Sequence, residues 1–160
     1  MKNEISSAPV SADLFAENAR RIRTQIAAIG FRQLLGAELD ELGPGSCTVS
    51  VARRPALLQH LGMFHGGVSA FLVDHGATIA AATIVKPGQA VLTAEYKLNL
   101  LAPATGHRLI CRAHVIRPGN NLTVVAADVF SIADGQEKQT AAALATIAVI
   151  DASKLPAATG

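Results

Sequence analysis

The segment from residue 59 to residue 85 reads QHLGMFHGGVSAFLVDHGATIAAATIV, and residues 68–85 of it are almost wholly apolar. A run of this length is barely enough to cross a bilayer. Asp74 and His75 lie near its middle, where a carboxylate in a membrane helix would cost about 2.5–3.5 kcal/mol. The segment therefore predicts a helix buried inside a protein, and no membrane span.

Strands are expected on both sides of this helix, which should begin near Gly66 and end before Pro87-Gly88. Turn signals separate the strands, notably Gly43-Pro44-Gly45 and Asp134-Gly135. The expected strands span residues 31–40, 47–53, 90–101, 107–117, 122–132 and 138–150. Runs of strands with one central helix indicate the α+β class, with an antiparallel sheet of five to six strands curled around the helix.

An amphipathic helix is expected over residues 11–29, ahead of the first strand. Its apolar residues recur at spacings of three and four, as one helical face does: Phe15, Ala19, Ile22, Ile26 and Ile29. Ser11 is suited to cap the start of this helix and Gly30 to end it. The arginines that fall mostly off the stripe are interpreted as a solvent-exposed face: Arg20, Arg21 and Arg23.

These elements divide the chain into three parts. Residues 1–30 form an N-terminal helical extension, residues 31–151 the main domain, and residues 152–160, with small residues and a proline, a flexible tail. The main domain is long enough to bury a core of its own.

The composition limits the classes of function. Half of the residues are hydrophobic and 16% are charged, which excludes disorder for most of the chain. The net charge is +2, and no Lys/Arg run exceeds two residues, so we expect no nucleic-acid partner. Cys47 and Cys111 are interpreted as small buried hydrophobes. The first fifteen residues lack the apolar core of a secretory signal, and we expect a cytoplasmic protein.

The glycine pair at the start of the central helix predicts a site for a polarised carbonyl. Gly66 and Gly67 lie where loop becomes helix, and the first N–H groups of a helix lack internal acceptors and carry partial positive charge. Such groups can hold a carbonyl oxygen as it becomes an oxyanion. Asp74 lies eight residues, or about 12 Å, along the helix from Gly66, too far for both to act on one carbonyl. A second subunit could supply the partner, which predicts active sites shared within a homodimer.

The same residues resemble the motif of hotdog-fold thioesterases of the phenylacetate-pathway (PaaI) and 4-hydroxybenzoyl-CoA type. That motif has an amide residue, five further residues, His-Gly-Gly, and a carboxylate nine residues after the histidine. Here these are Gln59, His65-Gly66-Gly67 and Asp74. Residues 94–104 also resemble the family's strand that ends in a Pro-Ala pair, and the similarity spans roughly residues 35–150.

The resemblance implies a hotdog fold and hydrolysis of an acyl-CoA thioester, without a cofactor or metal, in a homodimer or a homotetramer built as a dimer of dimers. Asp74 would be the nucleophile or the general base that activates water, and Gly66 would polarise the carbonyl through its N–H. Gln59 would orient water or contact the thioester. His65 would hold the loop or the helix start.

Three further positions match substrate-contacting or polar positions of the family. Gly67 would contact the substrate beside Gly66. Thr78, one turn after Asp74, matches a hydroxyl near the carboxylate. Thr93 matches a hydroxyl on the following strand, although the alternation there places it on the polar face, opposite Leu92.

Other interpretations of these residues stay open. Asp74 could form a structural ion pair with His75 or an arginine, and the glycines could only permit close packing. The pairing of Gln59 with Asp74 departs from the family's usual Asn with Asp or Gln with Glu, which leaves the water position open. The alternative function is a non-catalytic acyl-CoA-binding or regulatory hotdog module. The spacings of the histidines fit no standard zinc pattern, and the identity of the acyl group is not readable.

Overall fold

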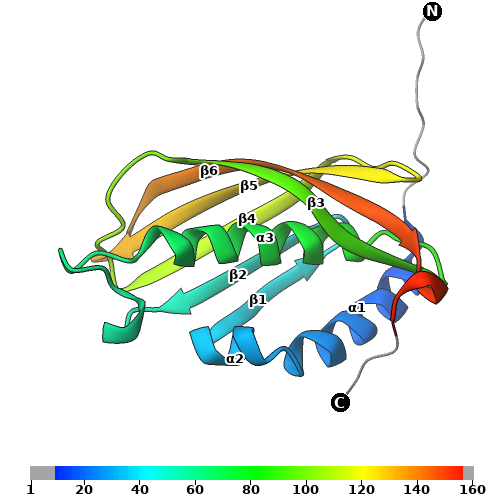
Figure 1. Cartoon of the computed structure of the whole chain (residues 1–160), viewed down its shortest axis with the longest axis horizontal. Coiled ribbons are helices and arrows are strands. Elements are labelled where there is room, and N and C mark those ends of the chain that lie inside the picture. The colour runs from blue at the N-terminus through cyan, green and yellow to red at the C-terminus, as the bar shows by residue number, and fades with distance from the viewer. Residues whose placement is uncertain (1–9, 157–160) are drawn as a thin grey trace, which may run out of the picture.

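The computed structural model of the chain describes residues 10–156, in which a six-stranded antiparallel sheet curls around the helix α3 (Gly66–Ala82), as Figure 1 shows. The strands are β1 (Ala37–Gly43), β2 (Ser46–Ala52), β3 (Gln89–Leu100), β4 (Arg108–Arg117), β5 (Leu122–Ala133) and β6 (Gln136–Asp151). Their order in the sheet is β1-β2-β4-β5-β6-β3, so β1 and β3 are its edges. The predicted α+β class and the wrapped helix are confirmed.

The core lies between α3 and the inner face of the sheet. Leu72 and Val73 of α3 have no exposed surface. Gly76 packs against the sheet, where an added Cβ would be in ordinary van der Waals contact with the Cys111 sulfur at 3.5 Å, and the Cys47 thiol donates to the Gly76 carbonyl at 3.2 Å. Both cysteines are buried and unpaired, which confirms their interpretation as small hydrophobes. Burial raises the pKa of Cys47 to about 12.

The prediction of a strand over residues 31–40 is wrong in its first half. The short helix α2 (Gly30–Leu35) occupies it, and β1 begins only at Ala37. Arg, Gln and Leu at positions 32–35 are good helix formers. Gly36 then ends the helix in the left-handed conformation, with φ of 64°.

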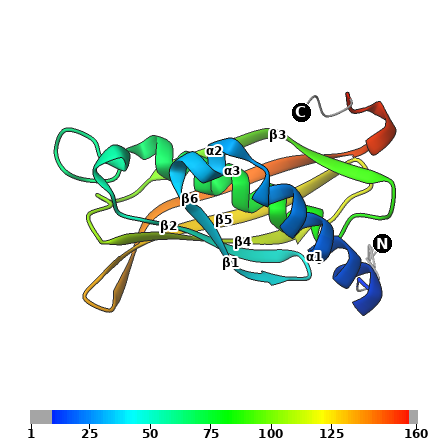
Figure 2. The same ribbon diagram turned by 90° about the horizontal axis from the view of Figure 1, so that it is seen from below.

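The predicted N-terminal helix is confirmed as α1 (Ala12–Ala27), and the Ser11 hydroxyl caps it by accepting from the Leu14 N–H at 3.3 Å. Its predicted end is wrong, because Gly30 begins α2 instead of ending α1. Ile22 and Ile26 of its apolar stripe are buried. Figure 2 shows α1 and α2 beside α3, on the side that the sheet leaves open. Of the three arginines expected in solvent, Arg21 is instead half-buried and donates to the Gln89 carbonyl at 3.0 Å.

A bulge in β3 overturns the predicted alternation of that strand. The pairing of β3 with β6 shifts register between Thr93 and Glu95, so Ala94 is an extra residue. An extra residue shifts the alternation of the strand, so side chains after a bulge point to the face opposite to the one that simple alternation predicts. Thr93 therefore points to α3, while Leu92 is 49% exposed on the opposite face.

The division of the chain into extension, domain and tail stays a prediction. Residues 1–9 of the extension and 157–160 of the tail lie outside the described residues. Within the predicted tail, Ala152–Lys154 form one turn of 3-10 helix, capped by the Asp151 carboxylate. Among the described helices, none combines the length and apolar character needed to cross a membrane.

Candidate active site

Asp74 lies on the face of α3 that meets β3, where two hydroxyls surround it. The Thr93 hydroxyl donates to Asp74 Oδ1 at 2.6 Å, a length typical of a hydroxyl bound to a carboxylate. The Thr78 hydroxyl donates to the Asp74 carbonyl at 2.8 Å and lies 3.0 Å from the Thr93 hydroxyl. Asp74 is half-buried, and no Lys, Arg or His within residues 10–156 forms an ion pair with it.

A cavity of about 480 Å³ opens beside Asp74. From α3 it is lined by Gly67, Ala70, Phe71, His75 and Thr78, and its wall is completed by Ile29, Phe31 and Tyr96. A mostly apolar cavity with a few convergent polar groups is the usual form of a small-molecule site. The cavity therefore places Asp74 where it could meet a bound substrate.

His75 is neutral in this setting. Its ring stacks on Phe71, with the centroids 5.1 Å apart and 17° between the planes. Burial lowers the pKa of His75 from 6.5 to about 4, and the charge of Arg32 lowers it further, against the opposing effect of Asp74. His75 thus lines the cavity as an uncharged ring rather than as a cation paired with Asp74.

The start of α3 explains the glycine pair. His65 caps the helix, since its Nδ1 accepts from the Gly67 N–H at 2.9 Å. The ring is so close that an added Cβ at Gly67 would lie 3.0 Å from that nitrogen. The N–H of Gly66, the first residue of the helix, has no acceptor among the described residues. Gly66 therefore offers a free donor at the positive end of α3.

Gln59 and Gly66 line a second, smaller cavity of about 170 Å³, together with Leu100. The Gln59 Oε1 accepts from the Leu61 N–H at 3.1 Å. One chain thus brings Asp74 together with Thr78, Thr93 and Gly67, but leaves Gln59 and Gly66 in a separate cavity. Nowhere in residues 10–156 do three His, Cys, Asp or Glu side chains gather in a way that could hold a metal ion.

Sequence reasoning missed part of the cavity wall. Phe71 and His75 could have been found, because with Gly67 and Asp74 they share one face of the helix by their spacing. Phe31 could not, because its segment was expected to be a strand. Simple alternation along the strand would put Tyr96 on the same face as Leu92, and the bulge at Ala94 separates the two.

The chain is similar to known proteins in sequence and in fold. A model of the thioesterase superfamily matches residues 61–138. The 1,4-dihydroxy-2-naphthoyl-CoA hydrolase of Listeria monocytogenes is 30% identical over 121 residues, which cover 76% of this chain and 96% of that protein. Human acyl-coenzyme A thioesterase 13 is 26% identical, with 72% of this chain and 83% of that protein covered. A thioesterase family protein from Silicibacter pomeroyi has a solved structure with 34% identity and a TM-score of 0.82, covering 84% of this chain and 98% of that one.

Proposed function

The chain belongs to the thioesterase superfamily and has its hotdog fold, as the resemblance predicted, and on this basis we propose that it hydrolyses an acyl-CoA thioester to a free acid and CoA. Two relatives are named for this chemistry, one as a naphthoyl-CoA hydrolase and one as an acyl-CoA thioesterase. The observation that carries the proposal is the half-buried Asp74, held by a hydroxyl and facing an apolar cavity.

A carboxylate in this position supports two mechanisms. As a nucleophile, an Asp74 oxygen would attack the thioester carbonyl, the C–S bond would break, and water would then hydrolyse the acyl-enzyme anhydride. As a general base, Asp74 would take a proton from the attacking water and the proton would pass to the departing thiolate. Both routes give the same products, and the Thr93 hydroxyl would hold the carboxylate in position in both.

The oxyanion would be held at the start of α3. We propose the free N–H of Gly66 as the donor, because the helix end adds partial positive charge there. Gln59, in the same small cavity, would orient water or contact the thioester. His65 would keep the helix start in place through its bond to the Gly67 N–H.

The distance between these groups supports a dimer. Asp74 and Gly66 of one chain are separated by eight residues of α3, or about 12 Å along the helix axis. A two-fold axis that sets two copies of α3 antiparallel would bring Asp74 near the partner's Gly66. We therefore propose a homodimer with shared sites, and the resemblance further implies a dimer of dimers.

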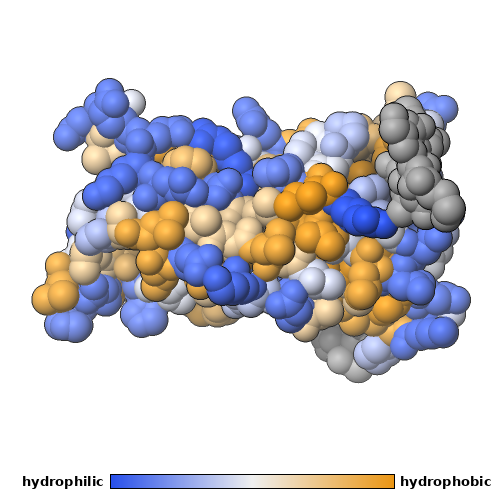
Figure 3. All heavy atoms as spheres, turned by 90° about the horizontal axis from the view of Figure 1, so that it is seen from above, coloured by the Kyte–Doolittle hydropathy of each residue, from blue (hydrophilic) through white to orange (hydrophobic). Residues whose placement is uncertain are grey.

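The edge strand β3 supports the same assembly. Its outer side is unpaired in one chain, and Leu92 and Leu100 of this strand are 49% and 62% exposed. Figure 3 shows apolar patches on the side of the molecule that is uppermost in Figure 1, where β3 and β6 lie. A long apolar edge exposed to water favours pairing with another chain.

The proposal includes the cellular compartment in which the protein acts. Cys47 and Cys111 are both unpaired in the core. Free thiols are typical of reducing compartments, and we propose that the protein acts in the cytoplasm.

The test of function is release of CoA from a panel of short, long and aromatic acyl-CoAs by the full chain, measured as free thiol. The proposal expects turnover of at least one of them. The alternative, a non-catalytic acyl-CoA-binding module, expects saturable binding without any released thiol. That second result would rule out hydrolysis as the function.

A further inference from the structure

The N-terminal segment formed by α1 and α2 supplies part of the wall of the cavity beside Asp74. Phe31 of α2 meets Phe71 of α3 edge to face, with the ring centroids 5.2 Å apart and the planes at 83°. Phe71 in turn stacks on His75. These separations are those of favourable aromatic pairs, so the three rings form one continuous wall that ends next to Asp74.

Aromatic rings are concentrated at this cavity, although the chain as a whole has few of them. The whole chain has five Phe, one Tyr and no Trp. Three of those six aromatic residues, Phe31, Phe71 and Tyr96, line this one cavity. His75 adds a fourth flat ring, and the pKa of about 4 that burial imposes keeps this ring uncharged near neutral pH.

A buried side chain fixes the position of this N-terminal segment. Asn18 of α1 is 3% exposed, and its Nδ2 donates to the carbonyls of Thr83 at 3.1 Å and Val85 at 2.9 Å, just beyond the end of α3. Its Oδ1 accepts from Arg21 at 3.0 Å. Asn18 therefore docks α1 on the end of α3, and α1 leads directly into α2 and Phe31.

The cavity side of this segment is not covered by the rest of the chain. Phe31 is 56% exposed and Ile29 is 38% exposed, although both line the cavity. An apolar group bound in the cavity would remove part of this surface from water. The wall is thus positioned to contact the acyl part of a substrate whose carbonyl lies at Asp74.

We propose that Phe31 is a specificity-determining residue, which with Phe71 and Tyr96 forms an acyl subsite walled by aromatic rings that prefers a ring beside the thioester over a flexible chain of equal carbon number. This inference rests on the proposed thioester hydrolysis. A planar group can stack on or meet these rings edge to face, whereas a saturated chain loses freedom about several bonds when it lies in the same place. Asn18 acts as a positioning residue for Phe31.

The test compares kcat/KM for phenylacetyl-CoA and octanoyl-CoA, whose acyl groups have the same number of carbon atoms. The enzymes are the unchanged full chain, Phe31→Leu, Phe31→Ala and a control, Leu34→Ala. Leu34 lies on the same short helix and is 68% exposed, but it does not line the cavity. The unchanged chain should prefer phenylacetyl-CoA. Both Phe31 variants should reduce that preference roughly 3- to 10-fold, as expected for one lost aromatic contact, while Leu34→Ala leaves it unchanged.

Asn18→Asp tests the positioning role without touching the cavity. It places a carboxylate against two carbonyl oxygens, and the phenylacetyl preference should fall as it does in Phe31→Leu. An equal loss of kcat/KM for both substrates in either the Phe31 or the Asn18 variants would show a merely structural role. A preference of the unchanged chain for octanoyl-CoA would overturn the inference.

If the unchanged chain releases no CoA from any acyl-CoA of the panel, the proposed function fails, and binding then tests the subsite alone. Tyr96 is the only tyrosine and the chain has no tryptophan, so its fluorescence reports from this cavity. Phenylacetate should change that fluorescence at lower concentration than octanoate does, and Phe31→Ala should remove the difference. Equal concentrations for the two acids in the unchanged chain would contradict the subsite.

Discussion

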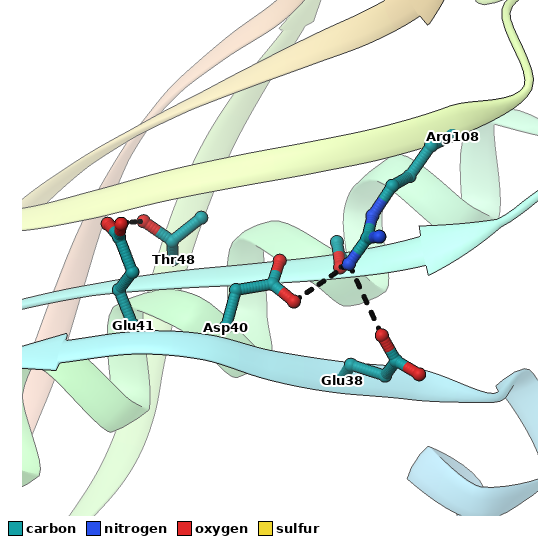
Figure 4. A network of polar contacts seen from close by, with 6 residues as sticks. Glu38, Asp40, Glu41, Thr48 and Arg108 are labelled. Carbon is teal, nitrogen blue, oxygen red and sulfur yellow. Dashed lines mark hydrogen bonds and ion pairs between the residues drawn. The ribbon is translucent and has the colours of Figure 1, made fainter.

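Acidic side chains are held in opposite ways on the outer face of the sheet and in the cavity. On the outer face, one nitrogen of Arg108 donates to Glu38 at 3.2 Å and to Asp40 at 2.8 Å (Figure 4). In the cavity, Asp74 accepts from the Thr93 hydroxyl at 2.6 Å, and no ion pair involves it within residues 10–156. The first arrangement pairs the carboxylates with a cation, whereas the second leaves the Asp74 carboxyl group without one.

The difference separates carboxylates that stabilise the fold from one that can react. The Arg108 pairs lie at the surface, where such pairs contribute about 0–1 kcal/mol. A half-buried carboxylate without a cation is harder to justify by stability, because its desolvation is not offset by a charge partner. We therefore expect Asp40 to matter little for activity and Asp74 little for stability.

The largest expected effect is on Asp74. Asp74→Asn keeps the shape and the contact with Thr93 but removes the basic, nucleophilic oxygen. The kcat/KM for the best acyl-CoA should fall at least about 100-fold, the usual contribution of a general base. Asp40→Asn is the matched control and should stay close to the parent. A kcat/KM for Asp74→Asn within a few-fold of the parent would contradict the mechanism.

At low pH, protonation of His75 places a positive charge next to Asp74 on α3. The pKa of His75 is about 4 in the folded chain, against an ordinary 6.5. The unfolded chain therefore binds this proton first as the pH falls, and folding stability declines between about pH 6.5 and pH 4. The loss should reach at most roughly 3 kcal/mol.

Urea unfolding of the parent and of His75→Phe, which keeps the stack on Phe71, measures this contribution. Groups remote from position 75 are the same in both proteins, so their contributions to the pH dependence cancel in the difference. The parent should lose more stability than the variant as the pH is lowered. Parallel curves would show that His75 is not held neutral by the fold.

Gln59 should have a smaller effect than Asp74. Gln59→Ala removes one orienting hydrogen bond, worth about 1–2 kcal/mol, and should lower kcat/KM roughly 5- to 30-fold. Steady-state kinetics on the same acyl-CoA measures it. A loss equal to that of Asp74→Asn would mean that Gln59 does more than orient, and an unchanged rate would remove it from the site.

The smallest expected effect is that of the Thr93 hydroxyl. The Thr48 hydroxyl, which lies outside the cavity, is its matched control. Thr93→Val removes the donor to Asp74, and kcat/KM should fall about tenfold because the carboxylate is no longer held in one position. Thr48→Val removes the same group from Glu41, to which the Thr48 hydroxyl donates at 3.1 Å outside the cavity. Its kcat/KM should equal that of the parent. Equal changes in both variants would show that the Thr93 contact has no special role.

The parts of the fold that local chemistry dictates could be predicted from the sequence. Asp134-Gly135 turns β5 into β6 with φ of 49° and 74°, as the two residues predicted. The apolar run around Asp74 predicted α3 and its burial. The spacing from His65 predicted Asp74 as the catalytic carboxylate, and Asp74 lies beside the apolar wall of the cavity.

The rest depends on contacts that no local pattern contains. The bulge at Ala94 reverses the faces of β3 and brings Thr93 to Asp74, although simple alternation pointed Thr93 away. The segment around Phe31 forms the helix α2, where a strand was predicted. Phe31 lines the cavity because this helix sets its ring against Phe71, forty residues later in the chain. Such pairings are decided by tertiary packing, which overrides short-range preferences.

A site shared between two chains is tested most directly by mixing two inactive variants, Asp74→Asn and Gly66→Pro, under conditions that exchange subunits. Proline at the first helical position is compatible with α3 but removes the N–H donor. A heterodimer would hold one intact site, formed by Asp74 of one chain and the partner's Gly66. Random exchange should therefore restore about a quarter of the parent activity. No recovery in a mixture shown to contain heterodimers, or an active monomer in sedimentation at the assay concentration, would contradict the shared site.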